Sequence, residues 1–203
     1  MIEPKSVVLV VDDDPSFRRS MRRLLRSSEF DVRTFRSAGE FLANPIPDVP
    51  ACLILDVRLR GGNGLGLQRQ LARTGIHLPI VFITGHGDIP SSVQAMKAGA
   101  IEFLTKPFDA QMLLKTVKEA VKRATVVRKT QAKLTELRRL YESLTRRERE
   151  VMGHVVSGKL NKQIASDLGT TEKTIKFHRG HVMHKMMVSS IAELVRAAAI
   201  LGI

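Results

Sequence analysis

The chain has 203 residues, 43% of them hydrophobic and 4% aromatic, and it contains no Trp. Since ordinary domains have roughly 100–150 residues, this length fits two small domains with aliphatic cores. The single cysteine, Cys52, excludes an internal disulfide, and its apolar surroundings in the sequence indicate a buried residue of a reducing compartment. Apolar stretches stay well below the ~20 residues that span a bilayer, and the N-terminus lacks a signal-peptide pattern. We therefore expect a cytoplasmic protein without a membrane partner.

The formal net charge is +13, and it is unevenly distributed along the chain. Residues 1–124 carry 18 Lys and Arg against 13 Asp and Glu, whereas residues 125–203 carry 15 against 7. The C-terminal part is therefore the more basic, which favours a polyanionic partner: nucleic acid first, and an anionic membrane surface second. A solvated basic helix face would give the same signal.

Residues 1–122 are predicted to form an α/β domain in which short apolar strands alternate with amphipathic helices. A strand followed by a helix, repeated five times, indicates a doubly wound sheet of five parallel strands. Uninterrupted apolar strands fit burial on both faces of such a sheet. The expected strands are Val7–Val11, Val32–Phe35, Cys52–Leu55, Pro79–Ile83 and Ile101–Leu104, and the expected helices cover about 15–28, 37–43, 64–74, 88–98 and 108–124.

Residues 123–143 are predicted to form a long helical linker, because this stretch has neither Gly nor Pro. Leu134, Leu137, Tyr141 and Leu144 recur at helical spacing and form one apolar seam. Packing on the chain's own domain and a coiled-coil contact with another chain explain this seam equally well.

Residues 144–203 are predicted to form an all-α domain of four helices. A short helix at 161–168, a tight turn at Gly169–Thr170 and a longer helix from 172 to about 187 form a helix-turn-helix, whose second helix enters the major groove of DNA. The starts of the four helices are marked by Thr145 with Glu148, by Asn161, by Thr171, and by Ser190 with Glu193.

A helical wheel divides the longer helix into a core stripe and an outer face. The stripe holds Ile175, His178, Val182 and Met186, and the opposite face is expected to meet phosphates and base edges. Gly180 on that face costs about 1 kcal/mol relative to Ala; we hypothesise that it allows close approach to the groove wall, with simple tolerance as the alternative. The expected DNA contacts are Lys162, Thr171, Lys173, Thr174, Lys176, Phe177, Arg179 and His184.

Three histidines on this helix, His178, His181 and His184, invite a metal-site interpretation. The outer two lie about 120° apart around the helix axis, and no fourth ligand is evident. One core histidine and two surface histidines are the preferred interpretation.

Residues that carry chemistry follow four of the predicted strands. Because the carboxyl ends of parallel strands meet at one edge, we expect their carboxylates to converge there and to hold Mg²⁺. A carboxylate can also attack a phosphoryl group, whose oxygens a lysine and a threonine would then contact. Each residue has a structural explanation as well, such as a helix cap for Asp14, but the combination favours a site. The residues are Asp12, Asp13 and Asp14 after the first strand, Asp56 after the third, Thr84 after the fourth and Lys106 after the fifth.

The segments Val-Val-Asp12-Asp13-Asp14, Leu-Ile-Leu-Asp56, Ile-Thr84-Gly-His-Gly-Asp and Glu-Phe103-Leu-Thr-Lys106-Pro107 resemble those of response-regulator receiver domains, over residues 5–124. The resemblance implies a flavodoxin-like fold in which Asp56 accepts phosphate from a histidine kinase. It implies that Mg²⁺ is held by Asp12, Asp13, Asp56 and the main-chain carbonyl of Arg58. It further implies a switch pair, Thr84 and Phe103, and contact of Lys106 with the phosphoryl group before a cis bond to Pro107.

One departure follows Asp56, where the family usually has Met-Pro and this chain has Leu59-Arg60. Loss of Pro should loosen the loop, which affects the lifetime of the phosphorylated state rather than phosphorylation itself. A haloacid-dehalogenase-like phosphatase also uses a strand-end Asp, but it places an acid where Arg58 stands. We therefore expect no enzymatic activity beyond phosphorylation and dephosphorylation of Asp56.

Residues 143–200 resemble LuxR-type helix-turn-helix domains through Leu144-Thr-Arg-Arg-Glu148, Gly158-Lys-Leu-Asn161-Lys162 and Thr174-Ile-Lys176-Phe-His178. The two halves together resemble the NarL/FixJ family, and its FixJ-like members most. This implies a homodimer when phosphorylated, sequence-specific binding to promoter DNA, and transcriptional activation with RNA polymerase as a partner. The last helix would assist dimerisation through Ile191, Leu194, Val195 and Ala198.

Two alternatives remain. An RNA-binding or protein-binding output is possible for the basic domain, although it lacks aromatic stacking platforms. A strip of arginines near the N-terminus is most simply a solvated face, with docking of the kinase as the second hypothesis. The strip consists of Arg18, Arg19, Arg22, Arg23 and Arg26.

Overall fold

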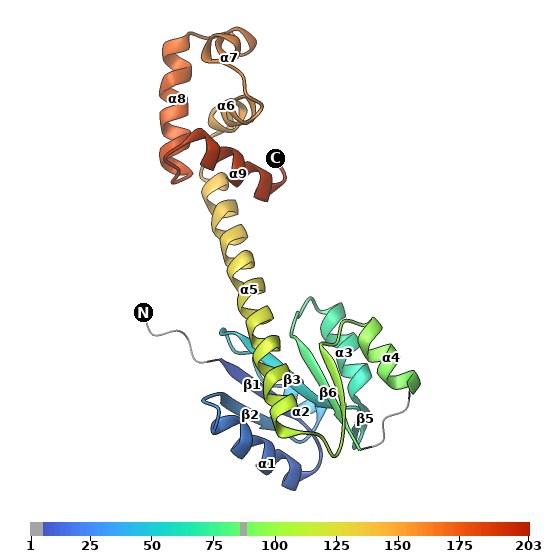
Figure 1. Cartoon of the computed structure of the whole chain (residues 1–203). Helices are drawn as coiled ribbons and strands as arrows, with labels where there is room; N and C mark the ends of the chain where they lie inside the picture. Colours follow the sequence, from blue (N-terminus) through green and yellow to red (C-terminus); the bar gives the residue numbers. More distant parts are fainter. Residues whose placement is uncertain (1–5, 86–88) are drawn as a thin grey trace. The chain divides into compact units, whose positions relative to one another are not determined.

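The computed structural model describes residues 6–85 and 89–203. The chain divides into two compact units, Met1–Arg128 and Lys129–Ile203, which are described separately below. The boundary falls within one uninterrupted helix, α5, which runs from Ala110 to Glu142 (Figure 1). The stretch 123–143, expected as a linker, is thus the continuation of the last helix of the first unit. Among the described residues, no helix is both long and apolar enough to cross a membrane.

The first unit contains a five-stranded parallel sheet in the order β2-β1-β3-β6-β7, which confirms the doubly wound fold (Figure 1). A short antiparallel hairpin of β4 and β5 after the third strand was not predicted. The strands are β1 (Val7–Val11), β2 (Asp31–Phe35), β3 (Ala51–Asp56), β4 (Arg58–Leu59), β5 (Gly62–Asn63), β6 (Ile80–Thr84) and β7 (Glu102–Thr105).

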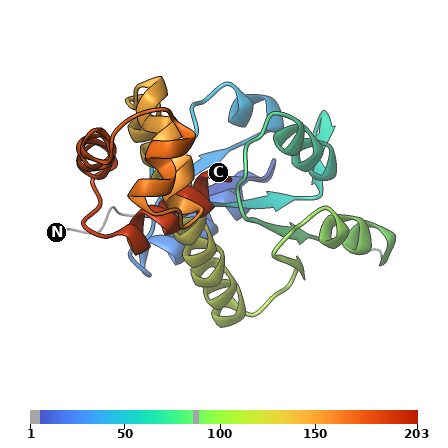
Figure 2. The same cartoon turned by 90° about the horizontal axis from the view of Figure 1, so that it is seen from above.

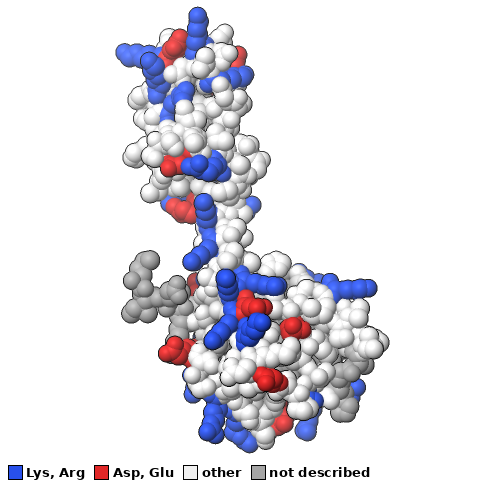
Figure 3. Space-filling model, in the orientation of Figure 1, with Lys and Arg blue, Asp and Glu red and all other residues white. Residues whose placement is uncertain are grey.

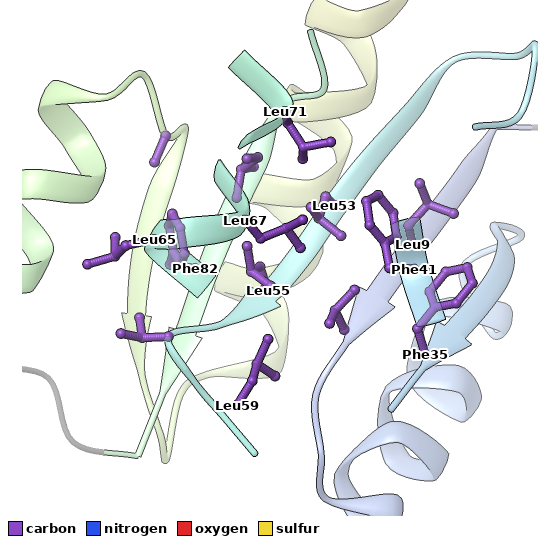
Figure 4. Packing of buried hydrophobic residues seen from close by; sticks show 14 of the residues in the cluster. Leu9, Phe35, Phe41, Leu53, Leu55, Leu59, Leu65, Leu67, Leu71 and Phe82 are labelled. Carbon is purple, nitrogen blue, oxygen red and sulfur yellow. The ribbon is translucent and has the colours of Figure 1, made fainter. Parts of the chain in front are cut away.

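Helices cover both faces of this sheet, because successive residues of a strand point to opposite sides. Leu9 and Val11 of β1 pack with α2, α3 and α4, whereas Val8 and Val10 pack with α1 and α5. Figure 2 shows α3 and the N-terminal part of α5 on opposite sides of the strands. Figure 4 shows the core between the sheet and α2, α3 and α4. The helices are α1 (Pro15–Arg26), α2 (Ala38–Leu42), α3 (Gly64–Arg73) and α4 (Ile89–Lys97). Residues 86–88 lie outside the described part of the chain. They include the end of the Ile-Thr84-Gly-His-Gly-Asp segment and the first residue of the expected helix 88–98.

The second unit contains four helices that follow α5, in the predicted order. They are α6 (Arg146–Val156), α7 (Asn161–Asp167), α8 (Glu172–Lys185) and α9 (Ile191–Leu201). The C-terminal end of α5 and the residues that follow it belong to their core: Leu137 of α5 and Leu144 after it are buried there, and Tyr141 is partly buried. For these three seam residues the structure shows packing on their own domain, while Leu134 is only half-buried.

Capping residues start these helices largely as predicted. Thr145 and Glu148 form a reciprocal capping box on α6, and the Thr171 hydroxyl accepts a hydrogen bond from the Thr174 amide on α8. The prediction for Asn161 is wrong, because Asn161 is the first residue of α7 and its side chain accepts a hydrogen bond from the Arg179 guanidinium. The N-terminus of α7 is capped instead by Gln163, whose side chain accepts a hydrogen bond from the Leu160 amide.

Candidate functional site

Two buried carboxylates and one lysine meet at the carboxyl edge of the parallel sheet. The strands β1 and β3 pair in register up to Val11 and Leu55, so the next residues, Asp12 and Asp56, lie side by side at the edge of the sheet. Lys106, which follows β7, places its Nζ 2.8 Å from Asp12 Oδ2 and 2.9 Å from Asp56 Oδ2. The structure therefore brings together three of the predicted residues from three strands.

Burial and hydrogen bonding shift the pKa values of the charged groups in this site. Burial raises the pKa of Asp12 above its ordinary value, in spite of hydrogen bonds from Lys106 and from the Asp14 amide. Burial by itself would lower the pKa of Lys106, but its hydrogen bonds to both carboxylates raise it. The ammonium also lies 3.8 Å from the centre of the Phe17 ring, which adds a cation–π contact. The peptide bond between Lys106 and Pro107 is cis, as the resemblance implied.

The remaining oxygens of the two carboxylates fix the loops around them. Asp12 Oδ1 accepts a hydrogen bond of 2.8 Å from the Asp14 amide, and Asp56 Oδ1 accepts one of 2.9 Å from the Arg58 amide. Asp14 caps α1 by accepting from the Ser16 amide, which matches its structural explanation. Asp14 is thus a helix cap rather than part of the pocket.

Asp13 points to a different partner. Its Oδ2 lies 3.0 Å from Nε of Arg60, whose side chain is 91% exposed. Among the described residues, no acidic, His or Cys side chains gather in a group of three that could hold a metal. The carboxylate oxygens of Asp12 and Asp56 are of the type that binds Mg²⁺. For Asp13 to bind the ion as well, its side chain would have to leave Arg60.

Gly64 packs closely against the main chain of Asp56, and sequence reasoning missed this. A Cβ atom added at Gly64 would lie 2.2 Å from the main-chain oxygen of Asp56, so no larger residue fits without a shift. The Gly64 amide also donates a hydrogen bond of 2.9 Å to the carbonyl of Val57. The run of glycines at 61–66 was the available signal, but it did not single out one position.

Thr84 and Phe103, the expected switch pair, occupy adjacent strands. Thr84 is buried at the end of β6, and its carbonyl accepts a hydrogen bond of 2.7 Å from the Lys106 amide. Phe103 on β7 is half-buried against the ring of Phe82, with the two ring centres 6.2 Å apart.

In the second unit, most of the predicted DNA-contacting side chains are on the surface. Thr174 is half-buried, with its hydroxyl 2.9 Å from that of Thr171. Arg179 is half-buried, and its guanidinium joins α8 to α7 through Asn161. The exposed members are Lys162, Thr171, Lys173, Lys176, Phe177 and His184.

The core stripe of α8 is confirmed for Ile175, Val182 and Met186, all of which are buried. His178 is only half-buried, and its Nδ1 atom is buried without a hydrogen-bond partner in the part of the chain that the structure describes. Gly180 faces open space, since nothing lies within 4 Å of an added Cβ.

A buried ion pair between α6 and α8 was not predicted. Glu148 accepts hydrogen bonds of 2.7 Å from Lys185 Nζ and of 2.7 Å from the Thr145 amide, and His181 Nδ1 lies 3.5 Å away. Burial by itself would raise the pKa of Glu148, but Lys185 and Thr145 outweigh it and lower this pKa to about 2. His181 therefore faces a carboxylate rather than a metal site.

The expected dimerisation face of α9 is only partly available. Leu194 and Ala198 are buried in the core of their own unit, so both predictions are corrected. Ile191 and Val195 remain 46% and 40% exposed. The resemblance implied that all four assist dimerisation, but α6 of the same unit packs against α9.

A doubly wound five-stranded unit with an acidic site at the carboxyl edge of its sheet, followed by a helix-turn-helix unit, defines the class of DNA-binding response regulators. The family model of the response regulator receiver domain matches residues 8–118, and that of bacterial regulatory proteins of the luxR family matches residues 142–198. The chain belongs to the NarL/FixJ family of two-component response regulators, which are transcription regulators and not catalytic enzymes.

Similar proteins extend over nearly the whole chain. Nodulation protein W of Bradyrhizobium diazoefficiens is 51% identical over 98% of this chain and 88% of its own. Response regulator protein TodT of Pseudomonas putida is 45% identical over 97% of this chain and 86% of its own. The solved structure of the response regulator StyR is 46% identical, with a TM-score of 0.90, and covers 97% of this chain and 99% of that one.

Proposed function

We propose that this cytoplasmic regulator is phosphorylated on Asp56 by a sensor histidine kinase, and that phosphorylation promotes dimerisation and sequence-specific binding to promoter DNA. The observation that carries the proposal is the contact of Lys106 Nζ with both Asp12 and Asp56. It supplies a nucleophilic carboxylate next to a fixed positive charge in a buried pocket. We further propose that the bound protein activates transcription together with RNA polymerase.

Phosphoryl transfer to Asp56 needs a carboxylate oxygen that is free to attack. One oxygen of Asp56 forms a bond to phosphorus while the bond from phosphorus to the kinase's histidine nitrogen breaks. Lys106, which contacts that carboxylate now, would then contact a phosphoryl oxygen instead. The Thr84 hydroxyl would donate to another of these oxygens.

The residues proposed to hold Mg²⁺ are Asp12, Asp13, Asp56 and the main-chain carbonyl of Arg58. When bound, the ion would neutralise negative charge that accumulates as a phosphoryl group approaches two carboxylates. Burial of Asp12 and Asp56 supports this assignment, because buried anions need a compensating charge. Asp13 contributes once its side chain leaves Arg60.

The response to phosphorylation is proposed to be a shift between two conformations. In the phosphorylated form Thr84 moves towards the phosphoryl group, and Phe103, half-buried in this structure, packs inward. A face of the receiver then becomes competent to dimerise. Phosphorylation can favour that state only by the difference in its interaction energy with the two states.

The outer side of α8 and the residues around it are proposed to contact DNA. Lys173, Lys176 and Lys162 are exposed cations suited to phosphates and guanine edges, and exposed Phe177 suits a thymine methyl group. Thr171, Thr174 and His184 would add polar contacts. Arg179 uses one side of its guanidinium for Asn161 and would use the other for DNA. In the dimer, Ile191 and Val195 would be the contacts from α9.

The test is enrichment of fragmented genomic DNA by the full chain, with and without Mg²⁺ and beryllofluoride as a phosphoryl mimic. We expect selective enrichment only with the mimic, and none of this response in Asp56→Asn. Asp31→Asn, which alters an exposed aspartate of β2, is the matched control and should respond as the wild type does. Equal enrichment in both conditions would contradict control by Asp56, and no enrichment in either would contradict the DNA-binding output.

A further inference from the structure

Four arginines surround one hollow on the first unit that the proposed phosphorylation and DNA binding do not use. The hollow has a volume of about 280 Å³ and lies between the first turns of α1 and the segment from β2 to α2. Figure 3 shows Lys and Arg side chains gathered at the lower end of this unit, where α1 lies in Figure 1. Arg18, Arg19 and Arg22 come from α1, and Arg36 follows β2.

The fold holds these guanidinium groups in place. Arg18 Nη1 donates a hydrogen bond of 2.6 Å to the carbonyl of Asp12, and Arg22 donates to the Thr34 hydroxyl. Arg19 Nη2 donates to the Ser16 hydroxyl at 3.2 Å. A guanidinium has five N–H donors. The three guanidinium groups from α1 are thus each oriented by one hydrogen bond, and most of their donors remain available.

Negative charge around the hollow is scarce. Its lining includes one carboxylate, Glu40, whose Oε2 accepts a hydrogen bond of 2.7 Å from the Arg36 amide and lies 3.8 Å from Arg36 Nε. The α1 helix itself carries five arginines and no acidic residue. Four cations therefore share one small volume with one anion, and their mutual repulsion is relieved when an anion with several charges binds.

We propose that this arginine hollow binds an oligophosphate, a small anion with two or more linked phosphates such as inorganic triphosphate or a nucleoside polyphosphate. Guanidinium forks match phosphate oxygens through paired hydrogen bonds. A single carboxylate of an acidic peptide would neutralise only one of the four cations. The phosphates of duplex DNA are distributed along a convex surface, so they would reach the rim of the hollow rather than fill it.

The probe is sodium triphosphate, titrated into the full chain by calorimetry at fixed ionic strength. The test variant is Arg19→Ala with Arg22→Ala. The control is Arg23→Ala with Arg26→Ala, which removes the same charge from exposed positions of the same helix that do not line the hollow. Thermal unfolding without ligand shows whether each variant is folded. A variant at Arg36, Arg36→Ala, repeats the test without altering α1.

We expect the test variant to bind triphosphate at least about tenfold more weakly than the wild type, and the control less than about twofold. Equal weakening in both double variants would overturn the proposal, because bulk charge would then explain binding. Absence of triphosphate binding to the wild type would overturn it as well. Binding of a short DNA duplex that depends on Arg19 and Arg22, without triphosphate binding, would assign the surface to nucleic acid instead.

Discussion

Nε of Arg60 lies 3.0 Å from Oδ2 of Asp13, so one of the acidic residues expected at the pocket is held by a residue of the loop after β3. Arg60 is one of the two positions at which this chain departs from the Met-Pro of the family pattern. The departure therefore has a second consequence besides the loss of proline. It places a cation beside Asp13, and this cation would compete with Mg²⁺ for the carboxylate. Because Arg60 is almost fully exposed, this ion pair is weak and reversible.

Replacing Arg60 by Ala should tighten Mg²⁺ binding, since Asp13 would no longer be partly neutralised. An exposed ion pair contributes at most about 1 kcal/mol, so the gain should be no more than about fivefold in affinity. Calorimetric titration of Mg²⁺ measures it. Arg73→Ala, which removes an exposed arginine at the end of α3, should leave the affinity unchanged. Equal or weaker affinity in Arg60→Ala would show that Arg60 does not compete with Mg²⁺ for Asp13.

Gly64→Ala should impair both the stability and the phosphorylation of the receiver. The new Cβ would meet the Asp56 carbonyl oxygen at 2.2 Å, so the start of α3 or the end of β3 must move. Overpacking of this kind costs about 1–3 kcal/mol. Urea unfolding measures the loss, and labelling with a small-molecule phosphodonor measures the rate at Asp56.

Gly62→Ala is the matched control for that prediction. Nothing lies within 4 Å of a Cβ added at Gly62, two residues earlier in the chain. We expect near wild-type stability and labelling in this variant. If Gly64→Ala behaves in the same way, the close approach of the α3 backbone to Asp56 has no functional weight.

The parallel sheet and the pocket at its edge could be predicted because both follow from local sequence. A strand buried on both faces must be apolar along its whole length, as Val7–Val11 is, and its end is marked by the first charged residue. Once the strands are parallel and in register, Asp12 and Asp56 must lie side by side. The location of the pocket thus required only the strand ends and the order of the strands.

The errors share a different physical origin. A family resemblance and helical spacing do not reveal which element covers a side chain, so Leu194 and Val195 were both assigned to dimerisation although only Val195 is exposed. Glu148 and Lys185 are 37 residues apart, and no local pattern links them. Asn161 is a residue type that often caps helices, but its side chain accepts a hydrogen bond from Arg179 of α8. This tertiary contact, and not the local sequence, determines what the side chain does.

The stability of the helix-turn-helix unit should fall in acid because of Glu148. Its pKa is about 2 in the folded protein, below the ordinary value of 4.5, so the carboxylate stabilises the fold fully above pH 4.5. That contribution, at most about 3 kcal/mol, is lost as the pH falls from 4.5 towards 2. Urea unfolding across this range should show a shallower pH dependence in Glu148→Gln than in the wild type. Glu142→Gln, at an exposed position, is the control and should keep the wild-type slope.

Gly180→Ala should raise the stability of the second unit and lower its affinity for DNA. The position is in the interior of α8, faces open space and lacks any neighbour within 4 Å, so Ala removes the cost of Gly, about 1 kcal/mol, without a clash. If the helix backbone approaches the groove wall closely at this point, the added methyl group must push it away. Thermal unfolding and titration of a target duplex measure the two effects. Higher stability with unchanged affinity would rule out the close approach and leave simple tolerance of Gly180 as its explanation.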